Sequence, residues 1–309
     1  MISLEDIESF LIAEQIEFKK QGSVQQASKF CSLKRLEPNG LYYVVGDLTR
    51  DFVDSIILCD TTRTKFDSLN TYILVDNPQL LFYQLMNAFS EKKTVGIHPS
   101  AIIHSSAVIG KSVTIGANSV IGKVVVGENV VIKENVVLHD NVKVGSNCII
   151  SSSSVIGADG VAWVWDKKKK ERVIQPQIGG VDLGNNIFVG SNVTIVRGSV
   201  NENTEIGEGT LIAHGSQIGH GVTIGRNVHI ANNVAIAGNA NIRDRAFLGA
   251  GAVVVSQMTV AKDVVIGAGA VISRPITTEG ITLIATPARA VPSSGKKLTG
   301  VPEPLKDKE

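Results

Sequence analysis

Residues 206–272 decide the fold, and they read IGEGTLIAHGSQIGHGVTIGRNVHIANNVAIAGNANIRDRAFLGAGAVVVSQMTVAKDVVIGAGAVI. Every sixth residue of this stretch, twelve in succession from Ile206 to Ile272, is Ile, Leu or Val. Neither an α-helix, with a side-chain period of 3.6, nor a β-strand, with a period of 2, sustains a period of six. A six-residue repeat is typical of one flat face of a β-solenoid, whose apolar anchor residue points inward. Glycine often follows the anchor, and we expect it to turn the corner with the φ and ψ angles that only glycine tolerates.

The same register extends toward the N-terminus. It runs from Ile97 to Ile156 with one five-residue step, and it resumes at Leu183. Residues 161–175, VAWVWDKKKKERVIQ, break the register and contain both Trp residues and four consecutive Lys residues. We therefore expect a loop that leaves one corner. It is either simply solvated or in contact with something anionic, such as a phosphopantetheine arm or an acidic carrier protein.

The rest of the chain lacks the six-residue phase. MISLEDIESFLIAEQI and NPQLLFYQLMNAF are predicted helices, and YYVV, DSIILCD and TYILVD are predicted buried strands. The sequence thus predicts a mainly β protein in three parts: an α/β domain at 1–95, the solenoid at 96–285 with its loop, and a tail at 286–309. We expect the tail to cover the last coil, because an open solenoid end exposes an unpaired strand edge.

Composition narrows the class of protein. The 309 residues suffice for about two domains, and a hydrophobic content of 43% excludes wholesale disorder. A net charge of +1 argues against a nucleic-acid partner. The three Cys residues have neither metal-site nor disulfide spacing, which favours a cytoplasmic location. We expect no signal peptide and no membrane helix, because the N-terminus has no basic start and no apolar run approaches about 18 residues.

Two histidines occupy equivalent places in the repeat. His214 and His220 each stand two residues after an anchor, and Gly238 lies eighteen residues beyond His220. Three six-residue faces make one coil, so Gly238 is expected one strand spacing from His220 on the same face. A base beside an unobstructed backbone N–H suits acyl transfer, because the base takes the nucleophile's proton and the N–H binds the oxyanion. From spacing alone, a plain surface histidine remains the alternative.

Several segments resemble one known family. SSSSVIGADG, VIQPQIGGVDLGNNIFVGSNVTIVRGSV, LIAHGSQIGHGVTIGRNV and SRPITTEG are similar to the UDP-3-O-acylglucosamine N-acyltransferases of lipid A biosynthesis. GLYYVVGD and VDNPQLLFYQLM resemble that family's uridine-binding domain, and HIANNVAIAG resembles the sister O-acyltransferases. The resemblance implies a left-handed parallel β-helix and a homotrimer with active sites between subunits.

The resemblance also assigns roles. It makes His220 the general base and the Gly238 N–H the oxyanion donor, and it places Asp159 and Gly160 at the start of a loop that shapes the acyl-donor cleft. Gln257 stands where the family has a second His near the donor. Tyr43 keeps the aromatic slot of the uracil-binding motif, and His214 is a further candidate for substrate binding.

The chain also departs from the family. TIVRG has Val196 where the family has Asp, and Ala213-His214 replaces the family's Asp-Asn pair. The family's long C-terminal helix gives way to ATPARAV, which is similar to the ending of acetyl-CoA-dependent hexapeptide acetyltransferases. The chain could therefore be an orthologue or a paralogue that acylates a different amino sugar.

We expect an enzyme that transfers an acyl group from an acyl carrier protein or coenzyme A thioester to a nucleotide-linked amino sugar. We expect no bound cofactor and no metal, because a histidine side chain titrates near pH 6.5 and can act as a base unaided. An acetyl-CoA-dependent O- or N-acetyltransferase is one alternative. A non-catalytic or zinc-dependent β-helix protein is another, and stoichiometric zinc in the purified protein would favour it.

Overall fold

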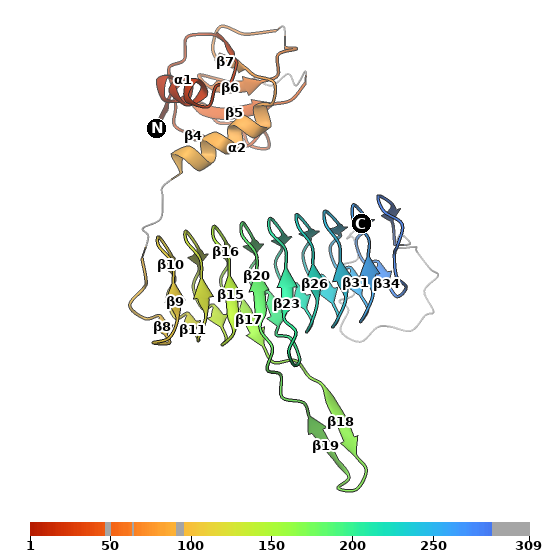
Figure 1. The fold of residues 1–309 in the computed structure, drawn as a ribbon. Helices are drawn as coiled ribbons and strands as arrows, with labels where there is room; N and C mark the ends of the chain where they lie inside the picture. The colour runs from red at the N-terminus through yellow and green to blue at the C-terminus, as the bar shows by residue number, and fades with distance from the viewer. Residues whose placement is uncertain (47–50, 64, 91–95, 286–309) are drawn as a thin grey trace, which may run out of the picture. The chain divides into compact units, whose positions relative to one another are not determined.

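The computed structural model describes residues 1–46, 51–63, 65–90 and 96–285. The chain separates into two compact units, Met1–Lys93 and Thr94–Glu309 (Figure 1). The predicted tail at 286–309 and the ATPARAV segment lie outside the described residues, apart from Ala285. No helix in the described ranges is both long and apolar enough to cross a membrane.

The first unit is an α/β domain built on a five-stranded sheet. The strands in sheet order are β2 (Lys19–Gln21), β7 (Thr71–Leu74), β6 (Ile56–Cys59), β5 (Gly40–Val44) and β4 (Lys29–Phe30). The last four run parallel and β2 is antiparallel to β7, while β1 (Ile2–Ser3) and β3 (Gln26–Ala27) form a separate pair. The three predicted strands are confirmed as β5, β6 and β7.

Both predicted helices are present, and local sequence sets their starts. Helix α1 (Leu4–Ala13) begins with a capping box in which Ser3 and Asp6 satisfy each other's backbone N–H groups. Helix α2 (Pro78–Phe89) begins with Asn77 as N-cap and proline in its first turn. Their buried faces pack on the inner side of the sheet around Leu41, Leu58 and Ile73.

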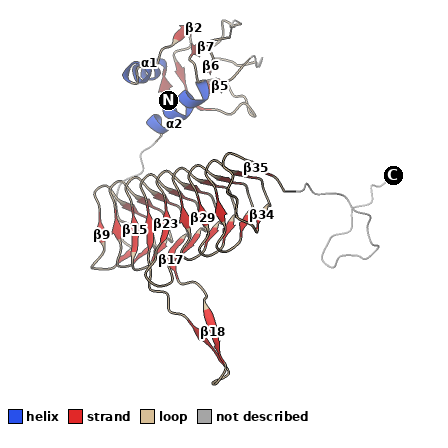
Figure 2. Ribbon diagram, turned by 45° about the vertical axis from the view of Figure 1, so that its right-hand side comes forward, coloured by secondary structure: helices blue, strands red, loops and turns tan. Residues whose placement is uncertain are grey.

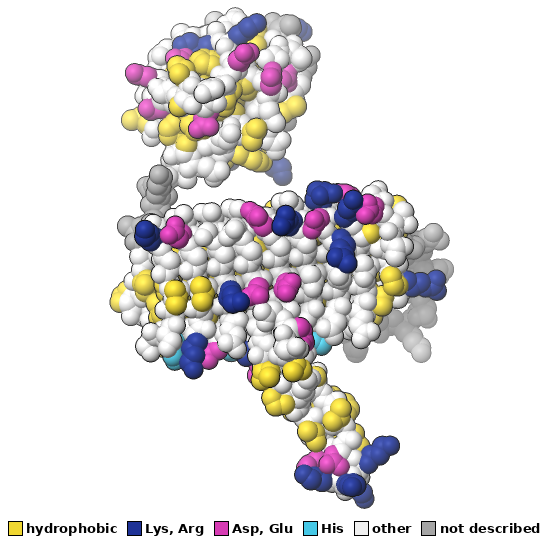
Figure 3. All heavy atoms as spheres, in the orientation of Figure 1, with side chains coloured by type: hydrophobic (Ala, Val, Ile, Leu, Met, Phe, Trp, Pro, Cys, Tyr) yellow, Lys and Arg dark blue, Asp and Glu magenta, His cyan; other side chains and the backbone are white. Residues whose placement is uncertain are grey.

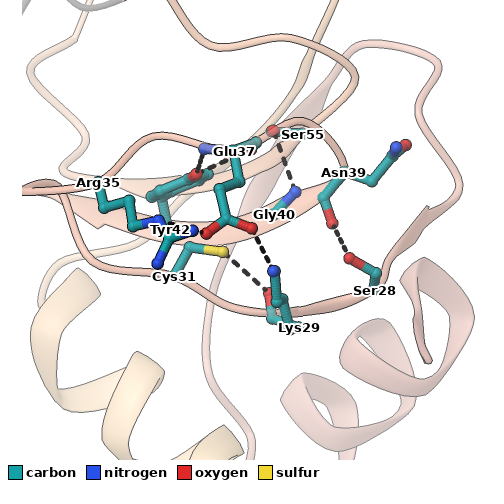
Figure 4. A network of polar contacts seen from close by, with 9 residues as sticks. All are labelled: Ser28, Lys29, Cys31, Arg35, Glu37, Asn39, Gly40, Tyr42 and Ser55. Carbon is teal, nitrogen blue, oxygen red and sulfur yellow. Dashed lines mark hydrogen bonds and ion pairs between the residues drawn. The ribbon is translucent and has the colours of Figure 1, made fainter.

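A polar network closes the opposite side of this sheet (Figure 4). The Tyr42 hydroxyl donates to the Glu37 carbonyl at 2.8 Å and accepts from the Glu37 N–H at 2.6 Å. The Glu37 carboxylate pairs with Lys29 and, at 3.0 Å, with Arg35. Its hydrogen bond to Lys29 lowers the pKa of Glu37. These contacts fix the segment that enters β5.

The second unit is a parallel β-helix of triangular coils made of three sheets (Figures 1 and 2). Sheet I contains β10 (Thr114–Ile115), β13 (Val131–Ile132), β16 (Ile149–Ile150), β21 (Phe188–Val189), β24 (Leu211–Ile212), β27 (His229–Ile230), β30 (Phe247–Leu248), β33 (Val265–Ile266) and β35 (Thr282–Leu283). Sheet II contains β8 (Ile102–Ile103), β11 (Val120–Ile121), β14 (Val137–Leu138), β17 (Val155–Ala158), β22 (Thr194–Val196), β25 (Gln217–Ile218), β28 (Ala235–Ile236), β31 (Val253–Val254) and β34 (Val271–Ile272). Sheet III contains β9 (Val108–Ile109), β12 (Val125–Val126), β15 (Val142–Val144), β20 (Val181–Leu183), β23 (Thr204–Ile206), β26 (Thr223–Ile224), β29 (Asn241–Ile242) and β32 (Thr259–Val260).

The predicted register is confirmed. All twelve anchors from Ile206 to Ile272 are at most 5% exposed, and anchors of successive coils pair with one another, as Ile206 does with Ile224 and Val254 with Ile272. A second inward column, two residues before each anchor, was not predicted. It holds small or β-branched residues such as Val222, Val228 and Ala240, all buried. Two side chains per face therefore point into the narrow interior.

The corner glycines serve a different purpose from the one predicted. Those directly after an anchor do not adopt positive φ, with the exception of Gly157. They are required by close approach instead, because a Cβ at Gly207 would lie 2.4 Å from the backbone of Gly225. Positive φ falls three residues after the anchor, where Asn227 (φ 54°) and Gly221 (φ 62°) are examples. Asn and Gly are the residues that tolerate the left-handed region best.

The predicted loop at 161–175 is in fact a hairpin. Strand β18 (Trp163–Asp166) pairs antiparallel with β19 (Glu171–Ile174), and the ribbon leaves the β-helix after β17 (Figures 1 and 2). We call residues 163–174 the arm.

Ile224→Asp is expected to prevent the β-helix from folding. It places a carboxylate among buried aliphatic side chains with no cationic partner, at a cost of about 3–5 kcal/mol. Circular dichroism should show loss of the cooperative melting transition. Thr223→Asp, which faces outward in the same strand, is the control and should melt nearly as the unaltered chain does. Normal melting of Ile224→Asp would refute the register.

Candidate active site

One corner of the β-helix gathers most of the predicted site residues. It joins sheets II and III and consists, on five successive coils, of residues 158–160, 197–203, 219–221, 237–239 and 255–257. We call it the base corner. It holds Asp159, Gly160, His220, Gly238 and Gln257 one above another in coil order. The six-residue register accounts for this convergence, since each coil returns the chain to the same corner.

His220 is held in a defined orientation at this corner. Its side chain is half-buried, and its Nδ1 lies 3.1 Å from the Ser199 hydroxyl of the coil below. Its Nε2 lies against Gly238, where a Cβ would come within 2.5 Å of that nitrogen. With Nδ1 engaged by Ser199, Nε2 is the nitrogen left for chemistry. Gly238 is therefore the residue that leaves room for the imidazole.

The backbone N–H of Gly238 lies two residues after its anchor, Ile236. At some equivalent positions a polar side chain of the next coil accepts this N–H. Five such pairs are Lys123 with Asp140, Glu128 with Ser146, Ser146 with Asn185, Ser191 with His214, and Arg226 with Asp244, at 2.8–3.1 Å. Within the described ranges, the Gly238 N–H has no such acceptor. A donor free of internal partners is what an oxyanion site requires.

His214 lies at a different corner, between sheets I and II. Its Nδ1 accepts the Ser191 N–H at 2.8 Å, so in the neutral ring the proton sits on Nε2. Such an imidazole can donate through Nε2 and cannot accept a proton there. His214 and His220 thus lie at different corners of the same chain. They also differ in the role of Nε2, which is a donor in neutral His214 and is available as a base in His220.

Ser199 is the contact that the sequence analysis missed. It lies in a lengthened turn, 197–203, where Glu202 accepts the Ser199 N–H at 2.7 Å and also binds the Val200 N–H. Backbone hydrogen bonds to its carboxylate, including that from Ser199, lower the pKa of Glu202. The turn is visible in the sequence as the eleven-residue step from Ile195 to Ile206. That break in phase was the available signal.

The segments that flank the arm pack beside this turn. The Gly160 N–H donates to Gln177 Oε1, and Asp159 forms an ion pair with Arg197 at 3.3 Å. Gln177 is only 6% exposed, and its Nε2 has no hydrogen-bond partner among the described residues. Val196 lies next to it, since both would contact a Cβ at Gly160. The Val that replaces the family's Asp thus stands beside an unsatisfied amide.

The two remaining candidate site residues, Gln257 and Tyr43, lie in different units of the chain. Gln257 is exposed at the base corner with φ of 63°, and its N–H donates to the Gly238 carbonyl at 3.0 Å. Tyr43 belongs to the α/β unit, where its half-buried ring packs against Phe82 at 5.1 Å between centroids. Among the residues that the structure describes, no three His, Cys, Asp or Glu side chains are grouped as metal ligands.

The repeat is that of bacterial hexapeptide transferases. The model of the bacterial transferase hexapeptide (six repeats) matches residues 123–158 and 203–238, and that of the hexapeptide repeat of succinyl-transferase matches 241–274. No curated protein sequence matches the chain significantly.

Solved structures of acyltransferases have the same fold. UDP-N-acetylglucosamine acyltransferase from Francisella novicida is 28% identical, with a TM-score of 0.55, over 62% of this chain and 67% of its own. LpxA from Acinetobacter baumannii is 26% identical, with a TM-score of 0.54, over 63% of this chain and 73% of its own. The O-acyltransferase from Moraxella catarrhalis, at 24% identity and a TM-score of 0.55 over 63% and 73%, shares the fold.

The fold and the repeat define the class: the protein is a hexapeptide-repeat acyltransferase built on a left-handed parallel β-helix. The expectations of that fold and of acyltransferase activity are confirmed. Within the class, the resemblance to the N-acyltransferases stays a prediction, because the Francisella novicida structure is that of a UDP-N-acetylglucosamine acyltransferase.

His220→Ala is expected to lower the rate of acyl transfer by about 10²–10⁴-fold, the usual contribution of a general base. The fold should persist, because the side chain lies at a corner and not in the interior. His214→Ala is the matched control and should cost less. Steady-state kinetics measures both, and a larger loss for His214→Ala would mean that the base has been assigned to the wrong corner.

Gly238→Ala is expected to lower the rate by about 10²-fold, since the new methyl group must displace the imidazole from its position beside the N–H. Gly238 does not have positive φ, so alanine introduces no backbone strain. Ser256→Ala, one coil on at the same corner position, is the control and should keep both rate and melting temperature. Full activity of Gly238→Ala would contradict the proximity argument.

Proposed function

We propose that the protein is an N-acyltransferase that moves an acyl group from a thioester to the amino group of a nucleotide-linked amino sugar. The observation that carries the proposal is the base corner, where an oriented imidazole lies against Gly238, whose N–H has no acceptor among the described residues. The likeness to UDP-N-acetylglucosamine acyltransferases supports the nucleotide-sugar acceptor, and the sequence resemblance supports attack by nitrogen.

The residues divide the reaction between them. His220 Nε2 removes a proton from the acceptor amine as its nitrogen bonds to the thioester carbonyl carbon, and the Gly238 N–H hydrogen-bonds the resulting oxyanion. The C–S bond then breaks, and the imidazolium returns the proton to the leaving thiolate, which gives an amide and a free thiol. A base that acts through Nε2 carries its own proton on Nδ1, and Ser199 Oγ is placed to accept it.

The two imidazoles are not equivalent for this purpose. The Nδ1 lone pair of His214 accepts the Ser191 N–H, so the exposed Nε2 of the neutral ring would be a hydrogen-bond donor and not a base. We therefore assign His214 to binding a substrate acceptor atom. We assign Gln257, Asp159 and Gly160 to the thioester side of the base corner, as the resemblance implies.

We further propose that the protein is a homotrimer. The outward columns of sheets I and II are mainly apolar; they include Val131, Ile149, Phe188, Leu211, Phe247 and Val265 in sheet I and Ile102, Val120, Val137, Val155, Val253 and Val271 in sheet II. The outward column of sheet III is polar from its third strand on, with Lys143, Asp182, Glu205, Thr223, Asn241 and Thr259 (Figure 3). Contact between copies through sheets I and II would cover the apolar columns. It would put the base corner at the edge of each contact.

An O-acyltransferase is the second candidate function, because the matched structures act on UDP-N-acetylglucosamine. A donor and acceptor screen with mass-spectrometric detection separates the two. Acetyl-CoA and 3-hydroxyacyl carrier proteins are each paired with UDP- and dTDP-linked sugars that bear either a free amine or only hydroxyl groups. An amide product supports the proposal, and an ester from the amine-free acceptor supports the second candidate. Absence of transfer from every donor contradicts both.

The α/β unit offers a place for the nucleotide base. Tyr43 lines a depression of about 470 Å³ with Phe30, Leu33, Phe82 and Met86. Burial raises the pKa of the Tyr43 hydroxyl, in keeping with an apolar surrounding. We propose that the base stacks on the Tyr43 ring, an interaction worth about 1–3 kcal/mol per base.

Tyr43→Leu is expected to raise the acceptor KM about ten-fold and to leave the donor KM nearly unchanged. Tyr43→Phe keeps the π-face and should bind the acceptor normally. If the ring only packs against Phe82, the two variants should have equal acceptor constants, because packing needs bulk and not a π-face. That outcome would leave the nucleotide site unassigned.

A further inference from the structure

Every residue of the arm is exposed except Asp166, which is half-buried. Its register pairs Trp163 with Ile174, Val164 with Val173, and Trp165 with Arg172. Because side chains alternate across a ribbon, both Trp rings and Ile174 share one face, and the two Val side chains share the other. Trp163 is 49% exposed, Val164 68% and Ile174 62%, so neither face is covered. An isolated two-stranded ribbon is only marginally stable in water, which favours a covered state.

The arm is also basic. Residues 163–174 carry five basic and two acidic side chains, a net charge of +3, whereas the whole chain carries +1. Asp166 is engaged within the turn, where it accepts the N–H groups of Lys168 and Lys169 at 2.8 and 3.1 Å. The Arg172 guanidinium stacks on the Trp163 ring at 4.6 Å. Lys169 also pairs with Glu171 at 3.8 Å, and basic side chains gather at the tip of the arm (Figure 3).

We propose that the arm binds an anionic lipid surface. The boundary between headgroups and acyl chains can surround both exposed faces of the ribbon at once, which a single flat protein surface cannot do. Trp is the residue that prefers this boundary, and Lys side chains reach from it to the phosphates. The positive tip supplies the attraction to an anionic leaflet.

The arm connects this surface to the base corner. Its first strand follows β17, and its return segment hydrogen-bonds the Ser199 turn through the N–H of Ile178 to the Ser199 carbonyl at 3.1 Å. Lipid binding by the arm would therefore hold the base corner close to the headgroups. This inference does not depend on which acyl group or acceptor the enzyme uses.

Intrinsic fluorescence tests the proposal directly, because both Trp residues of the chain lie in the arm. The full-length protein is titrated with vesicles of phosphatidylglycerol and phosphatidylcholine, and separately with phosphatidylcholine alone. We expect the Trp emission to shift to shorter wavelength with the anionic vesicles only, and the shift to disappear at high salt. Co-sedimentation with the vesicles gives the affinity, and no substrate is needed.

A matched pair of variants separates the arm's charge from the protein's charge. Replacing Lys167, Lys168, Lys169 and Lys170 by Gln should weaken vesicle binding at least ten-fold. Replacing Lys111, Lys123, Lys133 and Lys143 of the β-helix by Gln removes the same charge and should change it less than two-fold. The melting temperature of both variants is checked first, since all eight side chains lie at the surface.

Four results would overturn the proposal. The first is unchanged emission with anionic vesicles, and the second is equal loss in the two variants. The third is emission typical of a buried indole in the protein alone that becomes that of an exposed indole on dilution, because a second copy would then cover the arm. A shift induced by an acidic protein and not by vesicles would likewise replace lipid with a protein partner.

Discussion

Parallel backbone hydrogen bonds between successive coils are the constraint on which the rest of this structure depends. The Gly219 N–H donates to the Ile236 carbonyl at 2.8 Å, and the Asn239 N–H donates to the His220 carbonyl at 2.8 Å. These two bonds bracket the contact between the His220 ring and Gly238 and fix it at one strand spacing. The buried anchors Ile218 and Ile236 hold the ladder in register from the inside. The ladder and the buried anchors together therefore constrain the place of the His220 ring against Gly238.

The interior could be predicted from the sequence because its signal is periodic. One unbroken phase gave the coil, the faces and the placement of His220 below Gly238. The corners could not be predicted as well, because two demands on glycine look alike in a sequence. Gly207 is required by close approach and Gly221 by positive φ, and only the backbone tells them apart. The second inward column could not be predicted, because it mixes small apolar residues such as Ala240 and Val222 with small polar ones and so has no uniform hydrophobic pattern.

The site shows the same limit more sharply. His214 and His220 are equivalent in spacing, and nothing in the repeat distinguishes a base from a donor. The distinction arises from the partner of Nδ1, a backbone N–H for His214 and a hydroxyl for His220. Ser199 supplies that hydroxyl from a turn that interrupts the six-residue repeat, so the repeat does not predict where Ser199 lies. The irregular turn thus supplies the contact that orients the base, and the regular repeat sets where the base lies.

The arm interrupts the sequence of the β-helix but does not interrupt its sheets. On either side of it, β15 pairs with β20, β16 with β21 and β17 with β22, so three ladders join the parts of the helix before and after the ribbon. Cleavage among the lysines at its tip would break the polypeptide without breaking a ladder. The two fragments would remain associated through their shared sheets, and the protein could be produced as two separate chains that assemble by edge-to-edge complementation.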